Sequence, residues 1–257
     1  AMAVFSRQLA PYDPIELHLQ DQLAPPSARY WFGTDELGRD ILSRIIAGAS
    51  ISLQAGLMAV ILAAAVGVAT GLVAGYMGGW FDIGFMRVWD TLLAFPAIFL
   101  AIAIVSILGP GTSNAIIAVA IINMPAFARL VRATTLSVTG TEFVEAARSL
   151  GCTDLRIMLK TILPNCVAPL MVQMAIAAPA AIIVEASLSY LGLGSQPPEP
   201  SWGNMLSSAQ AYLYRAPTYG VFPGVAITLV VIGMNYFADG LQDAIDPRRA
   251  HAAAKMK

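Results

Sequence analysis

The stretch Glu142-Phe-Val-Glu145-Ala-Ala-Arg-Ser-Leu-Gly151 is a short charged island between long hydrophobic segments. Glu142 and Glu145 suit the first turns of a helix, where the helix dipole favours negative charge. Ala146 and Ala147 are strong helix formers, and Gly151 fits the left-handed position that often ends a helix. The stretch therefore predicts a short helix with a glycine stop, presented on one face of a protein otherwise built for lipid.

The residues around this island predict a second helix after it. Thr139 and Glu142 have the spacing of a capping box, and Thr141 is a second candidate N-cap. Thr153 suits the start of a second helix with an apolar face, which Pro164 is expected to kink or close. The pattern predicts a helix–glycine–helix elbow at about residues 137–165 on the cytoplasmic surface. An amphipathic connector resting on lipid headgroups explains the same residues and stays open as an alternative.

The composition indicates a membrane protein. Of the 257 residues, 57% are hydrophobic and only 12% are charged, and the mean hydropathy is +0.68; soluble domains carry about 25% charged residues. A membrane helix needs about 20 mostly apolar residues. The sequence thus predicts an all-α, polytopic transmembrane helical bundle, with five visible spans at roughly residues 51–76, 83–108, 114–131, 167–191 and 220–241.

The remaining segments are assigned around these spans. Gly78-Gly79 and Gly109-Pro110-Gly111 predict tight turns. Residues 1–48 are interpreted as the end of an earlier membrane segment followed by an extracytoplasmic segment. Residues 49–249 form the transmembrane domain, and residues 250–257 form a cytoplasmic tail.

The basic residues indicate the orientation, because short cytoplasmic loops are enriched in Lys and Arg. With the C-terminus inside, ten basic residues lie on the cytoplasmic side and five outside. The five outside are Arg7, Arg29, Arg39, Arg44 and Arg215. This two-to-one bias predicts a cytoplasmic C-terminus and places the elbow inside.

Several motifs resemble one family of transport proteins. Glu145-Ala-Ala-x3-Gly151 followed by Leu163-Pro164-Asn165 resembles the EAA loop of inner-membrane permease subunits of bacterial ATP-binding cassette (ABC) importers, although Thr161 replaces the usual isoleucine. Further stretches resemble the C-type subunit of the dipeptide/oligopeptide/nickel permease family, over about residues 10–249. These stretches are Ala10-Pro-Tyr-Asp-Pro14, Trp31-Phe-Gly-Thr-Asp-Glu-Leu-Gly-Arg-Asp40, Ser43-Arg44, Gly75-Tyr-Met-Gly-Gly79, Met86-Arg87, Ser189-Tyr-Leu-Gly-Leu-Gly194 and Asp243-Ala-Ile-Asp-Pro-Arg248.

The resemblance implies a type I ABC importer permease fold, with six spans expected, in the bacterial inner membrane. Such a subunit is not an enzyme and binds no cofactor, since ATP and Mg belong to two partner ATPases. The other implied partners are a second, homologous permease and an extracytoplasmic substrate-binding protein. The substrate class is di- or oligopeptides or a related small solute, with glutathione-like compounds and nickel complexes left open. The implied ATPase-coupling residues are Glu145, Ala146, Ala147, Gly151, Leu163 and Pro164.

Ionisable residues within membrane spans are costly and usually face the bundle interior. Asp90, Glu185 and Asp239 are such residues here. The candidates for lining the transport pathway are Glu185, Asn123 and Asn235. The alternative is a structural role, for example an ion pair between Asp90 and Arg87. Gly67, Gly71 and Gly75 recur every four residues and predict close packing of one helix against another.

The outer motif Thr34-Asp35-x-x-Gly38-Arg39-Asp40 has two interpretations. In the first, it meets the binding protein or shapes an outer gate. In the second, it is a self-satisfied loop, whose polar groups bond to one another, and Asp35 or Asp40 caps the first span.

Other functional classes lack support in the sequence. The spacing of Cys152, Cys166, His18 and His251 predicts no metal site, and the net charge of −1 does not favour nucleic acid. A membrane enzyme would need His, Cys or paired carboxylates at one depth. The remaining alternative is an ion-coupled secondary transporter, which often shows inverted repeats; none is evident.

Overall fold

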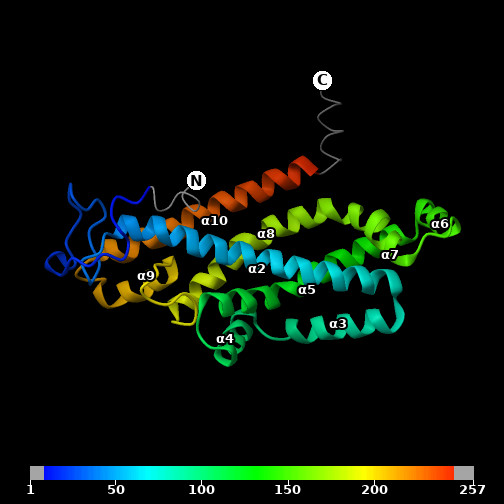
Figure 1. Cartoon of the computed structure of the whole chain (residues 1–257), viewed down its shortest axis with the longest axis horizontal. Helices are drawn as coiled ribbons and strands as arrows, with labels where there is room; N and C mark the ends of the chain where they lie inside the picture. The colour runs from blue at the N-terminus through cyan, green and yellow to red at the C-terminus, as the bar shows by residue number, and fades with distance from the viewer. Residues whose placement is uncertain (1–8, 246–257) are drawn as a thin grey trace, which may run out of the picture. The chain divides into compact units, whose positions relative to one another are not determined.

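The computed structural model describes residues 9–245, and the regular secondary structure of this part of the chain is helical, with long loops before α2 and between α8 and α9 (Figure 1). It contains no named strand, only an isolated bridge between Thr34 and Asp40. The interpretations of residues 1–8 and of the tail at 250–257 concern residues outside the described part. The helices are α2 (Ile41–Met77), α3 (Gly79–Leu93), α4 (Ala97–Leu108), α5 (Thr112–Thr139), α6 (Glu142–Ser149), α7 (Asp154–Ile157), α8 (Leu163–Tyr190), α9 (Trp202–Ala209) and α10 (Pro217–Ile245).

Four helices of the described chain are long and apolar enough to cross a membrane: α2, α5, the continuous run Asp154–Tyr190, and α10. They correspond to the first, third, fourth and fifth predicted spans. The predicted starts differ most for the fourth and first spans: the continuous run begins at Asp154 rather than 167, and α2 begins at Ile41, well before the predicted start at 51. Its 37 residues extend roughly 55 Å at about 1.5 Å per residue, more than the ~30 Å hydrocarbon core requires.

The second predicted span, 83–108, is wrong as a single helix. It is divided into α3 and α4, which are bent by 98° at the break between them. Pro96 explains the break, because it lacks the N–H for an α-helical hydrogen bond and disfavours helical geometry in the residue before it. If the bent pair counts as one broken span, the number of spans in the described chain rises to five.

The chain divides into two compact units. Unit 1 comprises Ala1–Ala59, Ala101–Val119 and Ala178–Gly233, and unit 2 comprises Val60–Leu100, Ala120–Ala177 and Met234–Lys257. Unit 1 has a buried cluster that includes Ile41, Met205 and Tyr219. Trp202 is also buried there and donates its indole N–H to the carbonyl oxygen of Ile45 at 3.0 Å. These contacts hold α9 against the start of α2.

In unit 2 the predicted close packing of α2 is confirmed, and its partner is α5 of the same chain. A Cβ atom on Gly71 would lie 2.4 Å from the carbonyl oxygen of Ala128, and one on Gly75 would lie 2.7 Å from the Cβ of Thr135. Gly67 lies similarly close to the Cβ of Phe127. The three glycines therefore let the two backbones approach more closely than any other residue allows.

Two ion pairs join α3 to α5 in unit 2. The guanidinium of Arg132 donates to both carboxylate oxygens of Asp82, at 2.5 and 2.7 Å. Arg129 pairs with Asp90 at 2.5 Å. The suggested pairing of Asp90 with Arg87 is thus wrong in its partner, since the carboxylate reaches across to α5 rather than along its own helix.

Candidate functional site

The charged island forms α6, but its N-terminus is not capped by a side chain. Thr141 occupies the N-cap position, and its hydroxyl donates to the carbonyl oxygen of Val138 instead of accepting from α6. Thr139 is the last residue of α5 and donates to the carbonyl oxygen of Thr135. The predicted capping box between Thr139 and Glu142 is therefore wrong, because α5 runs on to Thr139 and uses its hydroxyl.

The C-terminus of α6 confirms the glycine stop. Gly151 has a φ of +75°, in the left-handed region. Its N–H donates to the carbonyl oxygen of Arg148, and the N–H of Cys152 donates to that of Ala147. This pair of hydrogen bonds is a Schellman motif, which satisfies two carbonyl groups at the helix end and reverses the chain.

The second limb of the elbow differs from the prediction. Thr153 is at the N-cap position of α7, but its side chain makes no capping bond. Pro164 does not close the helix, because a π-helical turn, η2 (Met158–Ile162), joins α7 to α8. Such a turn accommodates the missing N–H of a proline within a continuous helix. The limb that holds Leu163 and Pro164 is therefore the beginning of a long membrane helix rather than a separate surface helix.

The elbow presents an apolar stripe that is only partly predictable from the sequence. Phe143, Ala146, Ala147 and Leu150 follow the spacing i, i+3, i+4 and i+7 and so share one face. Phe143 is 49% exposed and Leu150 is 84% exposed, whereas Val144 is fully buried. The sequence identified the two alanines, but the exposure of Phe143 and Leu150 depends on how α6 sits on unit 2. An exposed apolar stripe of this kind marks a protein–protein or membrane contact.

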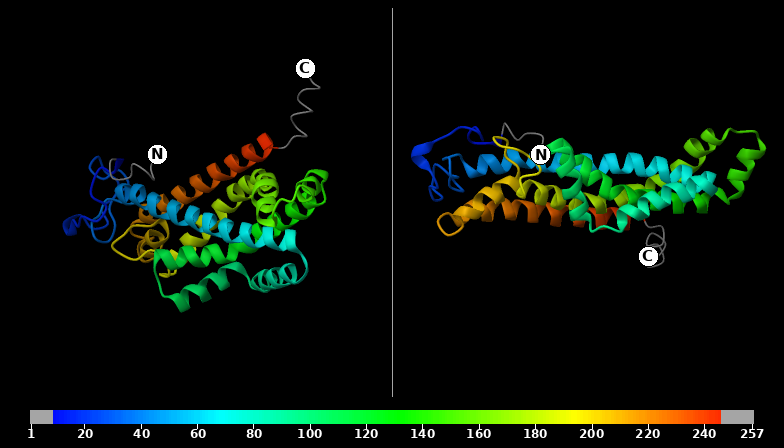
Figure 2. Two further views of the ribbon diagram at one scale, coloured as in Figure 1. Left: turned by 45° about the vertical axis from the view of Figure 1, so that its right-hand side comes forward. Right: turned by 90° about the horizontal axis from the view of Figure 1, so that it is seen from below.

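Charged groups flank this stripe. Glu145 is exposed in the first turn of α6, and Arg148 is exposed in its last turn, the favourable arrangement for the helix dipole. The pKa of Arg148 is raised, chiefly by a hydrogen bond to Tyr76 and then by the nearby charges. Arg148 therefore carries its full charge at neutral pH. Figure 2 shows the elbow of α6 and α7 at the same end of unit 2 as the C-terminal end of α2.

Glu185 is only 1% exposed and belongs to a polar network in unit 1. It accepts the hydroxyl hydrogen of Ser189 at 2.7 Å, and Ser189 in turn accepts the N–H of Ser195 at 3.0 Å. The network joins α8 to the loop that precedes α9. Asn123, which is half-buried on α5, and Asn235, which is exposed on α10, belong to unit 2.

We expect Glu185→Gln to leave the folded subunit in normal amounts, because an amide oxygen can also accept the Ser189 hydroxyl. Glu185→Leu removes the acceptor and leaves a buried donor unpaired, which costs roughly 1–3 kcal/mol. Thermal unfolding in detergent measures both effects. Equal unfolding temperatures for the two variants would contradict the network, and a transport defect in a normally assembled Gln variant would indicate a pathway role.

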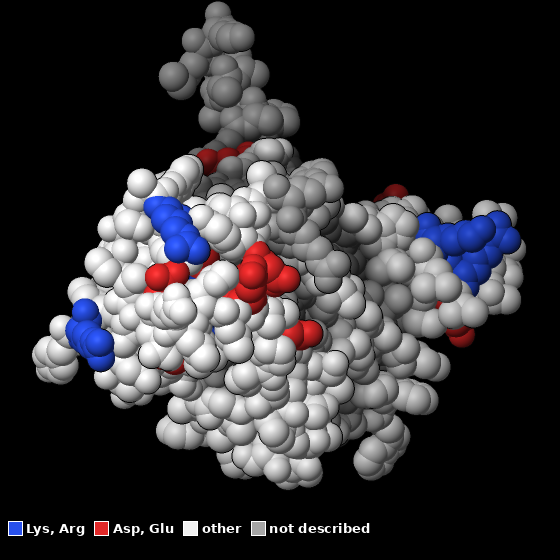
Figure 3. Space-filling view, turned by 60° about the vertical axis from the view of Figure 1, so that its left-hand side comes forward, with Lys and Arg blue, Asp and Glu red and all other residues white. Residues whose placement is uncertain are grey.

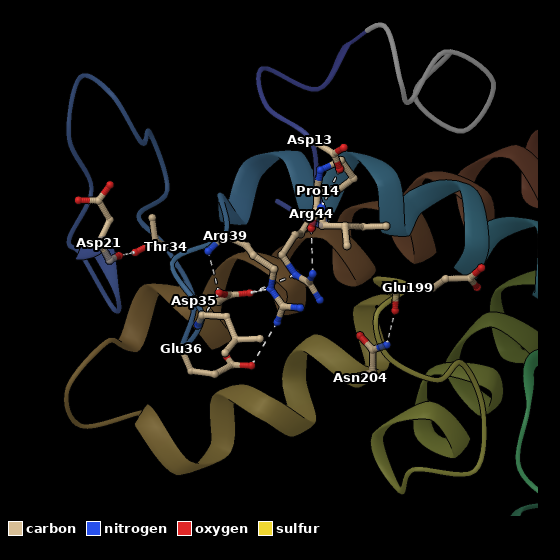
Figure 4. Close-up of polar contacts among 12 residues, drawn as sticks. Asp13, Pro14, Asp21, Thr34, Asp35, Glu36, Arg39, Arg44, Glu199 and Asn204 are labelled. Atoms are coloured by element: carbon tan, nitrogen blue, oxygen red, sulfur yellow. Dashed lines mark hydrogen bonds and ion pairs between the residues drawn. The ribbon is translucent and has the colours of Figure 1, made fainter. Parts of the chain in front are cut away.

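The outer motif in unit 1 is a self-satisfied loop, as one of its two interpretations predicts (Figure 4). Asp35 is fully buried and accepts the Arg39 Nε–H at 2.6 Å, while Arg44 lies 3.3 Å away. Asp40 accepts the backbone N–H and the hydroxyl of Ser43, at 2.8 and 2.6 Å, and so caps α2. The described residues hold no group of three or more His, Cys, Asp or Glu side chains suited to a metal ion.

Comparisons with known proteins agree on one family. Residues 67–251 match the model of the family described as "Binding-protein-dependent transport system inner membrane component". The glutathione transport system permease protein GsiD of Shigella flexneri serotype 5b (strain 8401) is 53% identical over 248 residues, covering 96% of this chain and 82% of that protein. The GsiD of Escherichia coli O6:K15:H31 is 51% identical with the same coverage.

Solved structures show the same fold. The MetNI methionine ABC transporter, in inward-facing conformations, matches with a TM-score of 0.63 at 18% identity, over 80% of this chain and 98% of that chain. An amino acid ABC transporter with histidines matches with a TM-score of 0.59 at 17% identity, over 77% of this chain and 92% of that chain. ATP in such systems is held by separate ATPases. The chain therefore belongs to the family of binding-protein-dependent transport system inner membrane components, and it is a non-catalytic, multi-pass permease subunit of an ABC importer.

Proposed function

We propose that the elbow of α6 and α7 is the surface through which this permease engages a cytoplasmic ATPase. The observation that supports this most strongly is the exposed stripe of Phe143, Ala146, Ala147 and Leu150, with Glu145 beside it. The two large side chains suit a groove on a partner, and the alanines allow that partner's backbone to come close. Glu145 is placed to pair with a basic group on the groove's rim.

The geometry also supports a role for Gly151, Leu163 and Pro164 in coupling the elbow to the membrane helices. Gly151 sets the angle between the limbs, and Leu163 and Pro164 begin the helix into which the second limb continues. A displacement of α6 is therefore passed through the Gly151 turn to α7, which continues without a break into α8. ATP drives the change because the closed ATPase pair, which binds ATP better than the open pair, favours a different position of the elbow.

The proposed partners follow from membership in an ABC importer. They are two ATPases, a second and homologous permease, and an extracytoplasmic binding protein. The elbow and the C-terminus then face the cytoplasm, and residues 9–48 face the opposite side, as the distribution of Lys and Arg favours. Residues 49–249 would form the transmembrane domain, with Asn123, Asn235 and Glu185 as candidates for contact with the pathway.

The outer face of unit 1 suits the binding protein. Asp13 and Glu199 are exposed there, and Asp21 is partly exposed beside Arg29. Figure 3 shows acidic side chains near the centre of the face turned forward and basic ones nearer its left edge. A partner with basic groups would be attracted to this face, and the attraction would weaken with salt.

Glutathione or a related short peptide is the proposed substrate. The support is the 53% identity to a protein named a glutathione transport system permease. Uptake of labelled glutathione by cells that contain the complete transporter tests this assignment. We expect unlabelled glutathione to inhibit this uptake at a lower concentration than a dipeptide or a nickel salt does. The reverse order would assign a different substrate.

Affinity purification from native membranes in a mild detergent, followed by mass spectrometry, tests the partners. We expect a second permease and one or two ATPases to accompany the chain. Recovery of the chain alone, still able to transport under an ion gradient, would contradict the assembly and favour the secondary transporter.

A further inference from the structure

We propose that Tyr76, at the end of α2, is a positioning residue that fixes the two limbs of the elbow and passes its movement to α2. The inference rests on the proposed coupling role of the elbow. Tyr76 lies far from α6 and α7 in the sequence, and the ATPase-coupling motif does not include it. Its contacts nevertheless fall on both sides of the Gly151 turn.

The first contact is with the second limb. The Tyr76 hydroxyl donates to Asp154 Oδ1 at 2.7 Å, across a sequence separation of 78 residues. Asp154 is the first residue of α7, directly after the N-cap Thr153. Because the acceptor is a carboxylate, this hydrogen bond is stronger than one between neutral groups.

The second contact is with the first limb. The guanidinium carbon of Arg148 on α6 lies 5.8 Å from the centre of the Tyr76 ring, within the range of a cation–π interaction. Arg148 also supplies the carbonyl oxygen that accepts the Gly151 N–H in the Schellman motif. One aromatic side chain thus touches a residue in the last turn of α6 and the residue that begins α7.

Tyr76 is held on a rigid support. The preceding residue, Gly75, lies against Thr135 and the carbonyl oxygen of Arg132, so α2 and α5 are in close contact just before Tyr76. Two residues later, Gly78 with a φ of +62° separates α2 from α3. The backbone at Tyr76 therefore has little freedom to move independently of the α2–α5 pair.

These contacts define the role of Tyr76. A Cβ atom placed on Gly151 would meet no atom within 4 Å, so the turn itself is not braced by packing. Tyr76 supplies the brace by joining both limbs to α2. When a partner moves α6, the brace makes α2 follow, in addition to the direct path through α8.

A double-mutant cycle with Tyr76→Phe and Asp154→Ala tests the brace in the complete transporter. The Phe ring keeps its face beside Arg148 but loses the hydroxyl group, and with it the hydrogen bond to Asp154. The Ala side chain offers no acceptor to the Tyr76 hydroxyl. Tyr214→Phe is the matched control, because the Tyr214 side chain is fully exposed. The measurements are ATPase co-purification, ATP hydrolysis, and substrate transported per ATP hydrolysed in proteoliposomes.

We expect each single variant to retain the ATPases but to transport at least about fivefold less substrate per ATP, the lower range of coupling between distant sites. The double variant should be no worse than the stronger single variant, because each single variant already removes the Tyr76–Asp154 hydrogen bond. Normal transport per ATP in Tyr76→Phe, or additive losses in the double variant, would overturn the brace. Loss of the bound ATPases in Glu145→Lys tests the docking role separately, so failure of one proposal is distinguishable from failure of the other.

Discussion

Replacing Gly71 with Leu is expected to prevent formation of the folded subunit. A Cβ atom at this position would lie 2.4 Å from the carbonyl oxygen of Ala128 and 3.0 Å from the Cβ of Val131. The backbone oxygen of a helix cannot rotate away, so α2 and α5 would have to separate. Overpacking by a few atoms typically costs about 1–3 kcal/mol, and Leu adds more atoms than this contact can take. The measurement is the yield of monodisperse subunit in detergent.

Alanine provides a graded test at the same position. Gly71→Ala should destabilise the subunit by roughly 1–3 kcal/mol through the same clash. Gly84→Ala is the matched control, since Gly84 lies within α3 and a Cβ there meets no atom within 4 Å. The control should be neutral or stabilising by up to about 1 kcal/mol, because Ala favours a helix over Gly. Equal unfolding temperatures for both variants would contradict the close contact of α2 with α5.

Glu145→Lys should weaken binding of the ATPase while leaving the permease folded in the membrane. The carboxylate is exposed and accepts no hydrogen bond from a side chain within residues 9–245, so folding loses little. A lysine would instead face the basic group expected on the ATPase. Loss of one member of a buried charge pair costs about 2–5 kcal/mol, so the affinity should fall at least about tenfold. Recovery of the ATPase with tagged permease, over a series of detergent washes, measures the loss.

Glu199→Lys is the control for this charge reversal. Its carboxylate is exposed on unit 1, in the face proposed to meet the binding protein. The variant should retain the ATPase and bind the binding protein less well, the opposite pattern from Glu145→Lys. Undiminished ATPase recovery in Glu145→Lys would count against the elbow as the docking surface.

Local sequence patterns predict the features that depend on neighbouring residues. Gly151 is identifiable from its place after a charged helix, and its left-handed φ follows from the same local requirement. The packing face of Gly67, Gly71 and Gly75 is evident from the four-residue spacing alone. Apolar length locates four of the spans, and these local rules explain why the fold class is predictable.

Features that depend on competition between hydrogen-bond partners, or on contacts between distant segments, are not predictable in this way. Thr139 has the spacing of a cap, but α5 continues to that residue and uses its hydroxyl. Pro164 breaks an ideal α-helix, yet the π-helical turn before it preserves the continuity. At Pro96, by contrast, the helix is interrupted and the chain bends sharply. The contact of Tyr76 with Asp154 joins segments that no local rule relates.

A photo-crosslinker at position 150 tests the central claim most directly. A benzophenone side chain replaces Leu150 in the complete transporter, and the same replacement of Leu229, an exposed residue of α10, serves as the control. Illumination should join position 150 to an ATPase subunit and leave position 229 without an ATPase product. If position 150 gives only lipid adducts, or no ATPase product while ATP-driven uptake is normal, the elbow is not the coupling surface.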